Sequence, residues 1–260
     1  MSRFRQMMTV VLLSGVAAGL ILFAVEHLTI VPLIRTAEVY EKAGEEALSG
    51  MEHSDEGWQP AEGWERTSLT ALATVLTGIG FAALLFGVAF LAGVPLDAKR
   101  GLLWGLAAFV CVGLAPAIGL PPRPPGVAVA DLDARQIWWV GTVVATAIAL
   151  WLFFGKGIPK LVRPLGIIVL ILSHLIGAPK ASGQNVVPEQ LIHRFTVLSI
   201  ASSGMFWLLL GLLGGLLYQQ MQRGSWDSAL GEVKPPSCGA RGSALIERRH
   251  RGLQPSSKRA

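Results

Sequence analysis

The sequence has 260 residues, of which 52% are hydrophobic and only 15% are charged, with a net charge of +5 and a mean hydropathy of +0.53. Ordinary soluble domains carry about a quarter charged residues, so this composition predicts an integral membrane protein and argues against a soluble enzyme. The positive charge lies in the C-terminal tail: residues 219–260 hold eight of the 22 Lys and Arg but only three of the 17 Asp and Glu. The remaining chain is neutral, so the net charge does not indicate a nucleic-acid partner. A disulfide scaffold is excluded too, since Cys111 lies in an apolar run and Cys238 in the basic tail.

Six runs are long and apolar enough to suggest membrane-spanning helices, which need roughly 20 apolar residues. The fifth is the weakest, because it is the shortest and has Arg163 and Pro164 near its start. A signal peptide is the alternative for the first run, but that run exceeds the usual apolar length of about 7–15 residues and lacks a cleavage site, so we expect it to be retained. The runs are approximately Met7 to Val25, Leu69 to Val94, Gly101 to Leu120, Ile137 to Phe154, Leu161 to Gly177, and Phe195 to Tyr218.

Loop charges predict the orientation, because cytoplasmic loops carry an excess of Lys and Arg. With a cytoplasmic N-terminus, 15 of the 22 Lys and Arg fall in the inside segments, which are 1–6, 95–100, 155–163 and 219–260. Discarding the fifth run would put either the N-terminus or the basic tail outside. The expected fold is therefore an all-α, multi-pass membrane protein, with about six spans, five being the alternative, and both termini in the cytoplasm.

The chain divides into a membrane domain, residues 1–222, and a basic cytoplasmic tail, residues 223–260. From Gly224 onward the tail is rich in Gly, Ser, Pro and Arg and lacks periodicity, which predicts disorder. The largest outer loop, residues 26–68, is acidic. One or two short helices outside the membrane are expected within residues 33–48 of this loop.

Glycine and proline patterns indicate how the helices are packed and connected. GxxxG spacings let two helix backbones approach closely, although with 30 Gly some arise by chance, and we expect them to serve packing within the chain rather than dimerisation. They occur at Gly15/Gly19, Gly101/Gly105 and Gly211/Gly215. The loop that begins PPRPPG at Pro121 is expected to be extended, because proline favours that conformation.

Histidine placement carries most of the chemical information. No P-loop, GxSxG, HExxH or CxxC motif occurs, so we expect no enzymatic activity and no tightly bound cofactor. Four of the five histidines fall on the predicted outer side, beside acidic residues at helix ends. Imidazole and carboxylate groups together suit divalent ions such as cobalt, nickel or zinc. The candidate metal ligands are His174, His27, His193, Glu26, Asp131 and Asp133.

Among these candidates His174 is the strongest. It lies within an apolar run, where a polar side chain is costly and often functional. For each of these histidines the alternative is that polar residues simply favour the membrane interface.

Several short stretches are distinctive as a set. They are Glu26-His27 followed by VPLI, GWERT at Gly63–Thr67, LAPAIGLPPRPPG at Leu114–Gly126, DLDARQIWW at Asp131–Trp139, HLIGAP at His174–Pro179, and FWLLLG at Phe206–Gly211. Through them most of residues 5–218 resembles the CbtA family of predicted cobalt transporter subunits. The resemblance implies a membrane component of cobalt uptake for cobalamin biosynthesis, often accompanied by a small His-rich partner protein, CbtB. The family is usually described with five spans, and the tail beyond about Arg223 has no counterpart in it.

Two other functions remain open at this point. The chain could capture another solute, such as a cobalamin precursor, or could be a structural or assembly subunit that never touches metal. The sequence shows no energy source, so an ion would move down the membrane potential, which favours cation uptake, or be coupled through a partner.

Overall fold

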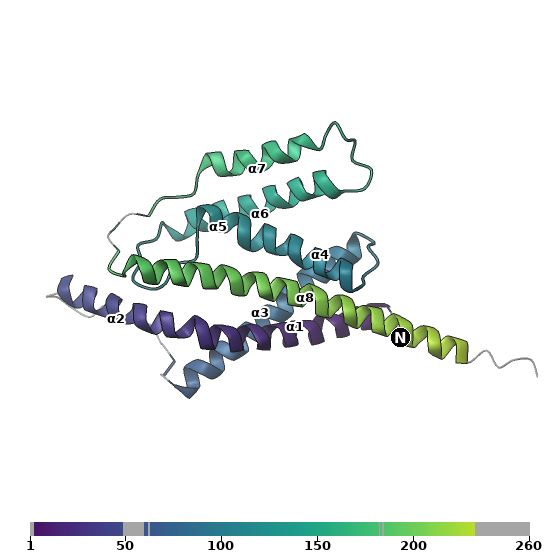
Figure 1. The fold of residues 1–260 in the computed structure, drawn as a ribbon, viewed down its shortest axis with the longest axis horizontal. Helices are drawn as coiled ribbons and strands as arrows, with labels where there is room; N and C mark the ends of the chain where they lie inside the picture. The colour runs from purple at the N-terminus through teal and green to yellow at the C-terminus, as the bar shows by residue number, and fades with distance from the viewer. Residues whose placement is uncertain (1–2, 49–59, 62, 182, 184, 232–260) are drawn as a thin grey trace, which may run out of the picture. The chain divides into compact units, whose positions relative to one another are not determined.

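The computed structural model describes residues 3–48, 60–61, 63–181, 183 and 185–231, and this part of the chain is helical with no β-strand (Figure 1). The prediction of an all-α fold is confirmed. The helices are α1 (Arg3–Thr29), α2 (Val31–Leu48), α3 (Trp64–Leu91), α4 (Ala98–Ala108), the π-helix η1 (Phe109–Leu114), α5 (Ala115–Gly119), α6 (Leu132–Phe154), α7 (Pro164–Ile176) and α8 (Glu189–Gly231).

Five helices are long and apolar enough to cross a membrane, judged by length and composition. They are Phe4–Thr29, Trp64–Leu91, Ala98–Gly119, Leu132–Phe154 and Glu189–Arg223. The remaining predicted span contains only the 13-residue helix α7, which at 1.5 Å per residue is about 20 Å long and short of a bilayer core of about 30 Å. Pro164 starts α7, and Gly177, with φ of +80°, follows its last residue.

The short helix α7 nevertheless returns the chain to the end of the molecule from which α6 started. It packs antiparallel along α6 (Figure 1), and residues 155–163 form the turn that reverses the direction. His174, near the end of α7, lies against Trp138, near the start of α6. Residues 178–181 therefore leave α7 beside the beginning of α6.

Two units make up the chain, Met1–Gln219 and Gln220–Ala260. In the second unit the structure shows helix as far as Gly231, so the prediction of irregular chain from Gly224 is wrong for residues 224–231. The first proline of the tail is Pro235, and the residues before it contain nothing that forbids a helix. Residues 232–260 lie outside the described residues, and their predicted disorder stays a prediction.

All three GxxxG pairs pack against other helices of the same chain, as expected. On α1, a Cβ added at Gly15 would come within 2.6 Å of the Cα of Ile79 on α3, and one at Gly19 within 2.9 Å of the Cα of Val75. On α4, a Cβ at Gly101 would collide with the carbonyl oxygen of Gly211 on α8. Absent side chains thus let the α1/α3 and α4/α8 backbones touch directly.

The interior of the first unit is small and apolar. Phe86 and Leu210 are fully buried, and Phe81 on α3 packs against both Phe206 and Trp207 of α8. Large apolar side chains on the outer faces are instead exposed, with Leu84 at 64% and others like it on most helices. An apolar exterior of this extent fits surroundings of lipid rather than water.

The π-helix η1 widens the span that runs from α4 to α5. The backbone N–H of Ala115 bonds to the carbonyl of Val110, five residues back, and Pro116 follows without an N–H to offer. Single widened turns of this kind often mark functional sites in helices. Here the widened turn lies directly before Ala115, whose carbonyl contacts His174.

Candidate functional site

The candidate site lies at the end of the first unit where α1, α5 and α7 finish and α6 and α8 begin (Figure 1). The proline-rich loop is fixed there between α2 and the segment before α8. Glu41 of α2 accepts a hydrogen bond from the backbone N–H of Gly126 at 3.0 Å, and the side chain of Asn185 accepts one from Ala128 at 3.1 Å. Ala37, Val127 and Val187 form a small buried cluster beneath these contacts.

The hydrogen bond between Glu41 and Gly126 predicts that Glu41 holds the proline-rich loop in place. Replacing Glu41 with alanine removes a charge-assisted acceptor from a partly buried N–H, which typically costs about 1.5–3 kcal/mol. We expect amide hydrogen exchange in residues 123–130 to become faster by tenfold or more, with the spanning helices unaffected. The control is Lys42→Ala, because Lys42 is exposed on the same helix. Equal exchange in the two variants would show that Glu41 does not hold the loop.

His174 is half-buried and has polar contacts at both ring nitrogens. Its Nδ1 lies 2.9 Å from the carbonyl oxygen of Leu170 and 3.1 Å from the Ser173 hydroxyl, and its Nε2 lies 3.2 Å from the carbonyl oxygen of Ala115. The ring stands edge-on to Trp138, with the planes at 86°. Both ring nitrogens therefore face protein atoms, and the imidazole links α7 to α5 and α6.

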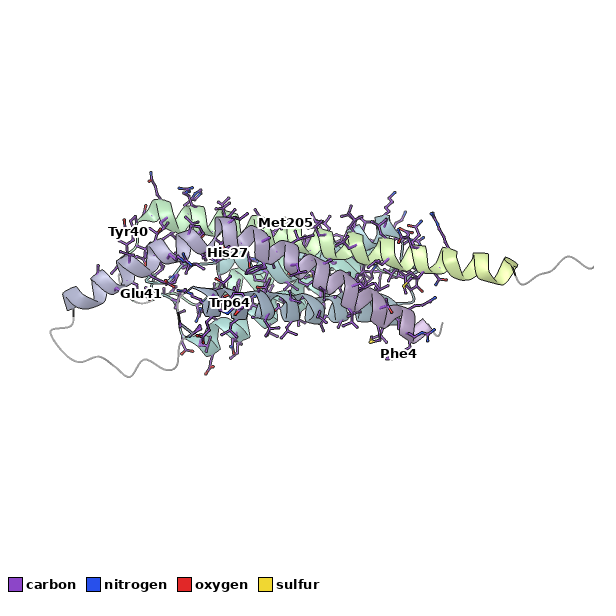
Figure 2. All side chains as sticks on the ribbon, turned by 90° about the horizontal axis from the view of Figure 1, so that it is seen from below. Phe4, His27, Tyr40, Glu41, Trp64 and Met205 are labelled. Atoms are coloured by element: carbon purple, nitrogen blue, oxygen red, sulfur yellow. The ribbon has the colours of Figure 1, made fainter. Side chains whose placement is uncertain are left out.

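Glu26 and His27 lie in the last turn of α1, and both side chains are half-buried. The ring of His27 lies against Phe23 one turn earlier, with centroids 5.5 Å apart. Figure 2 shows His27 on α1 and Glu41 further along, on α2.

The other three candidates are exposed. Asp131 caps α6, because its side chain accepts a hydrogen bond from the backbone N–H of Ala134 at 3.1 Å, a common role for Asp at this position. Asp133 lies in the first turn of α6 and His193 near the start of α8. Capping accounts for the placement of Asp131 without a metal.

The six candidates share one end of the first unit but do not form one cluster. Among the described residues, no group of three or more His, Cys, Asp and Glu side chains is arranged to hold a metal ion. The sequence predicted which helix ends these residues occupy, whereas their mutual distances depend on how the helices turn about their axes. The predicted six-residue site therefore stays a prediction.

Sequence reasoning missed the basic residues at this end. Arg123, Arg135 and Lys180 line a cavity of about 810 Å³, formed by the loop after α5, the start of α6 and the loop after α7. Arg66 of α3 forms an ion pair with Glu38 of α2 that joins these two helices. Arg123 lies in the PPRPPG stretch and Arg135 in the DLDARQ stretch, but the sequence analysis used these arginines only to predict the orientation in the membrane.

Comparison with known proteins supports the family resemblance. Residues 4–219 match the family described as "Probable cobalt transporter subunit (CbtA)". No curated protein and no solved structure matches the chain significantly. The matched residues coincide closely with the first unit, Met1–Gln219, and the chain belongs to the CbtA family of probable cobalt transporter subunits.

Proposed function

We propose that this protein is the membrane subunit through which a bacterial cell takes up cobalt for cobalamin biosynthesis. The family match over residues 4–219 is the observation that carries the proposal. The five long apolar helices and the apolar exterior support it, because a channel or carrier for an ion must cross the bilayer. In this role the protein binds and passes an ion, and does not transform a substrate.

The ion is first gathered, in this proposal, at the end that carries the candidate ligands. Glu26, Asp131 and Asp133 attract the cation, and His27, His174 and His193 supply nitrogen ligands. Their common location at one end of the first unit supports this. A change in helix rotation or a partner protein would be needed to bring three of them onto one ion.

Both termini face the cytoplasm in the same proposal. The return of the chain along α6 by way of α7 supports it, because the N-terminal end of α8 then lies at the same end as the C-terminal end of α1. Single cysteines at Ser49 and Ser225, in a chain lacking Cys111 and Cys238, should therefore differ in intact cells. An impermeant thiol reagent should label position 49 and spare position 225, and the reverse pattern would contradict the orientation.

The decisive experiment measures cobalt accumulation in cells that express the protein with and without a small His-rich partner protein, CbtB. We expect both chains together to raise accumulation of trace cobalt several-fold over cells with an empty vector. Nickel and zinc, measured in parallel, report ion selectivity. If cobalt accumulation is unchanged although the protein is present in the membrane at normal abundance, one of the other functions is favoured, either capture of another solute or an assembly role.

A further inference from the structure

The cavity beside the candidate site has the wrong charge for a metal ion. The charged side chains that line it are Arg123, Arg135 and Lys180, all of them basic, whereas Asp131 and Asp133 lie outside the lining. A divalent cation would be repelled by three like charges. The cavity therefore fits an anionic ligand.

The three cations also lack partners of opposite charge among the residues that the structure describes. Within the part of the chain that the structure describes, none of them forms an ion pair, and the Nε of Arg135 is buried with no hydrogen-bond acceptor. Buried donors in native proteins almost always have an acceptor. An anion bound in the cavity would pair with the exposed side chains of Arg123 and Lys180 and would also offset the charge of Arg135.

The remaining wall of the cavity is apolar. Its large apolar side chains are Leu120, Val129, Leu132, Trp139 and Val140. A free inorganic phosphate would satisfy the cations but leave this apolar wall in contact with water. A ligand with an anionic head and a hydrocarbon body would cover both parts.

The position of the cavity along the spans identifies such a ligand. One candidate span ends at Gly119 and another begins at Leu132, and residues at both ends line the cavity. Ends of spanning helices lie at the level of lipid headgroups, where tryptophan is also enriched. We propose that the cavity binds an anionic phospholipid, with its phosphate between the three cations and its upper acyl chain against Leu132, Trp139 and Val140.

Native mass spectrometry of the full-length protein in detergent tests this site. Phosphatidylglycerol, titrated into the delipidated protein, should bind at one site more tightly than phosphatidylcholine does. A basic side chain near a membrane surface contributes about fivefold to binding of anionic lipid. The triple variant Arg123→Gln, Arg135→Gln, Lys180→Gln should therefore raise the dissociation constant for phosphatidylglycerol at least tenfold.

The matched control removes three cations elsewhere. Lys156, Lys160 and Arg163 are exposed in the turn between α6 and α7, and neutralising them should leave the tight site unchanged. If the Arg135 substitution prevents folding, the double variant of the exposed Arg123 and Lys180 should still weaken binding several-fold. Equal loss in the control, equal binding of the two lipids, or displacement of the lipid by millimolar inorganic phosphate would each overturn the proposal, the last by identifying a free-phosphate site.

Discussion

Replacing Gly211 with valine is expected to prevent most of the protein from reaching its folded state. A Cβ at this position would collide with the carbonyl oxygen of Gly101 and lie 3.0 Å from the Cα of Gly105. These are backbone atoms of α4, so no rotamer change can relieve the contact. Overpacking of this kind usually costs about 1–3 kcal/mol and sometimes more, and separating α4 from α8 would also disrupt the contacts of Gly105 and Gly215 along the same interface.

The measurement is the yield and the thermal midpoint of the protein in detergent. Fluorescence-detected size-exclusion chromatography gives the yield of monodisperse protein. Gly141→Val is the matched control, because Gly141 lies within α6, is exposed, and has no atom within 4 Å of an added Cβ. We expect the Gly211 variant to lose most of the monodisperse peak and the control to behave like the wild type. A Gly211 variant with wild-type yield and midpoint would show that α4 and α8 do not touch as described.

Packing was the most predictable part of this fold. Each GxxxG pair identified from spacing alone has a helix backbone of the same chain against it. The reason is local, because two missing side chains one turn apart create a groove whatever surrounds them. The sequence could not predict which helices pair, because the pairing depends on how the spanning helices are arranged around one another.

The predicted fifth span shows where hydropathy misleads. The run from Leu161 to Gly177 is mostly apolar, but Pro164 sets the helix start and Gly177 lies beyond the helix end. The apolar run is therefore longer than the helix that it contains. The loop charges, by contrast, favoured a chain that returns after α6, and α7 does pack back along α6 despite its short length.

The sequence could predict which helix ends carry the candidate ligands, but not which of these side chains lie close together. Helix ends follow from the apolar runs, so the sequence could place the polar residues that flank those runs at helix ends. Which of them face one another depends on helix rotation, and the cap formed by Asp131 is a local contact that residue type and position alone cannot distinguish from a metal ligand. The basic residues of the cavity were missed because their side chains are not cation ligands, and only folding brings the three loops together around one space.

Replacing His174 with glutamine is the most direct test of the proposed metal path. The imidazole contacts the carbonyl oxygens of Leu170 and Ala115 and the Ser173 hydroxyl, so glutamine retains polarity and similar length while losing the imidazole ligand. Loss of a metal-binding histidine or of its supporting contacts commonly costs 10–100-fold in affinity or activity. We therefore expect the initial rate of uptake from trace cobalt to fall at least tenfold at unchanged membrane abundance.

Two further variants separate ligation from packing at this position. Ser173→Ala removes the neighbouring hydroxyl but leaves the imidazole and its contact with the Leu170 carbonyl, so its uptake should fall clearly less than that of His174→Gln. His174→Ala should lower both uptake and the thermal midpoint, because it also removes the link from α7 to Ala115 and Trp138. If His174→Gln accumulates cobalt at the wild-type rate, the imidazole serves only to join α7 to α5, and the ion must pass through ligands on other helices.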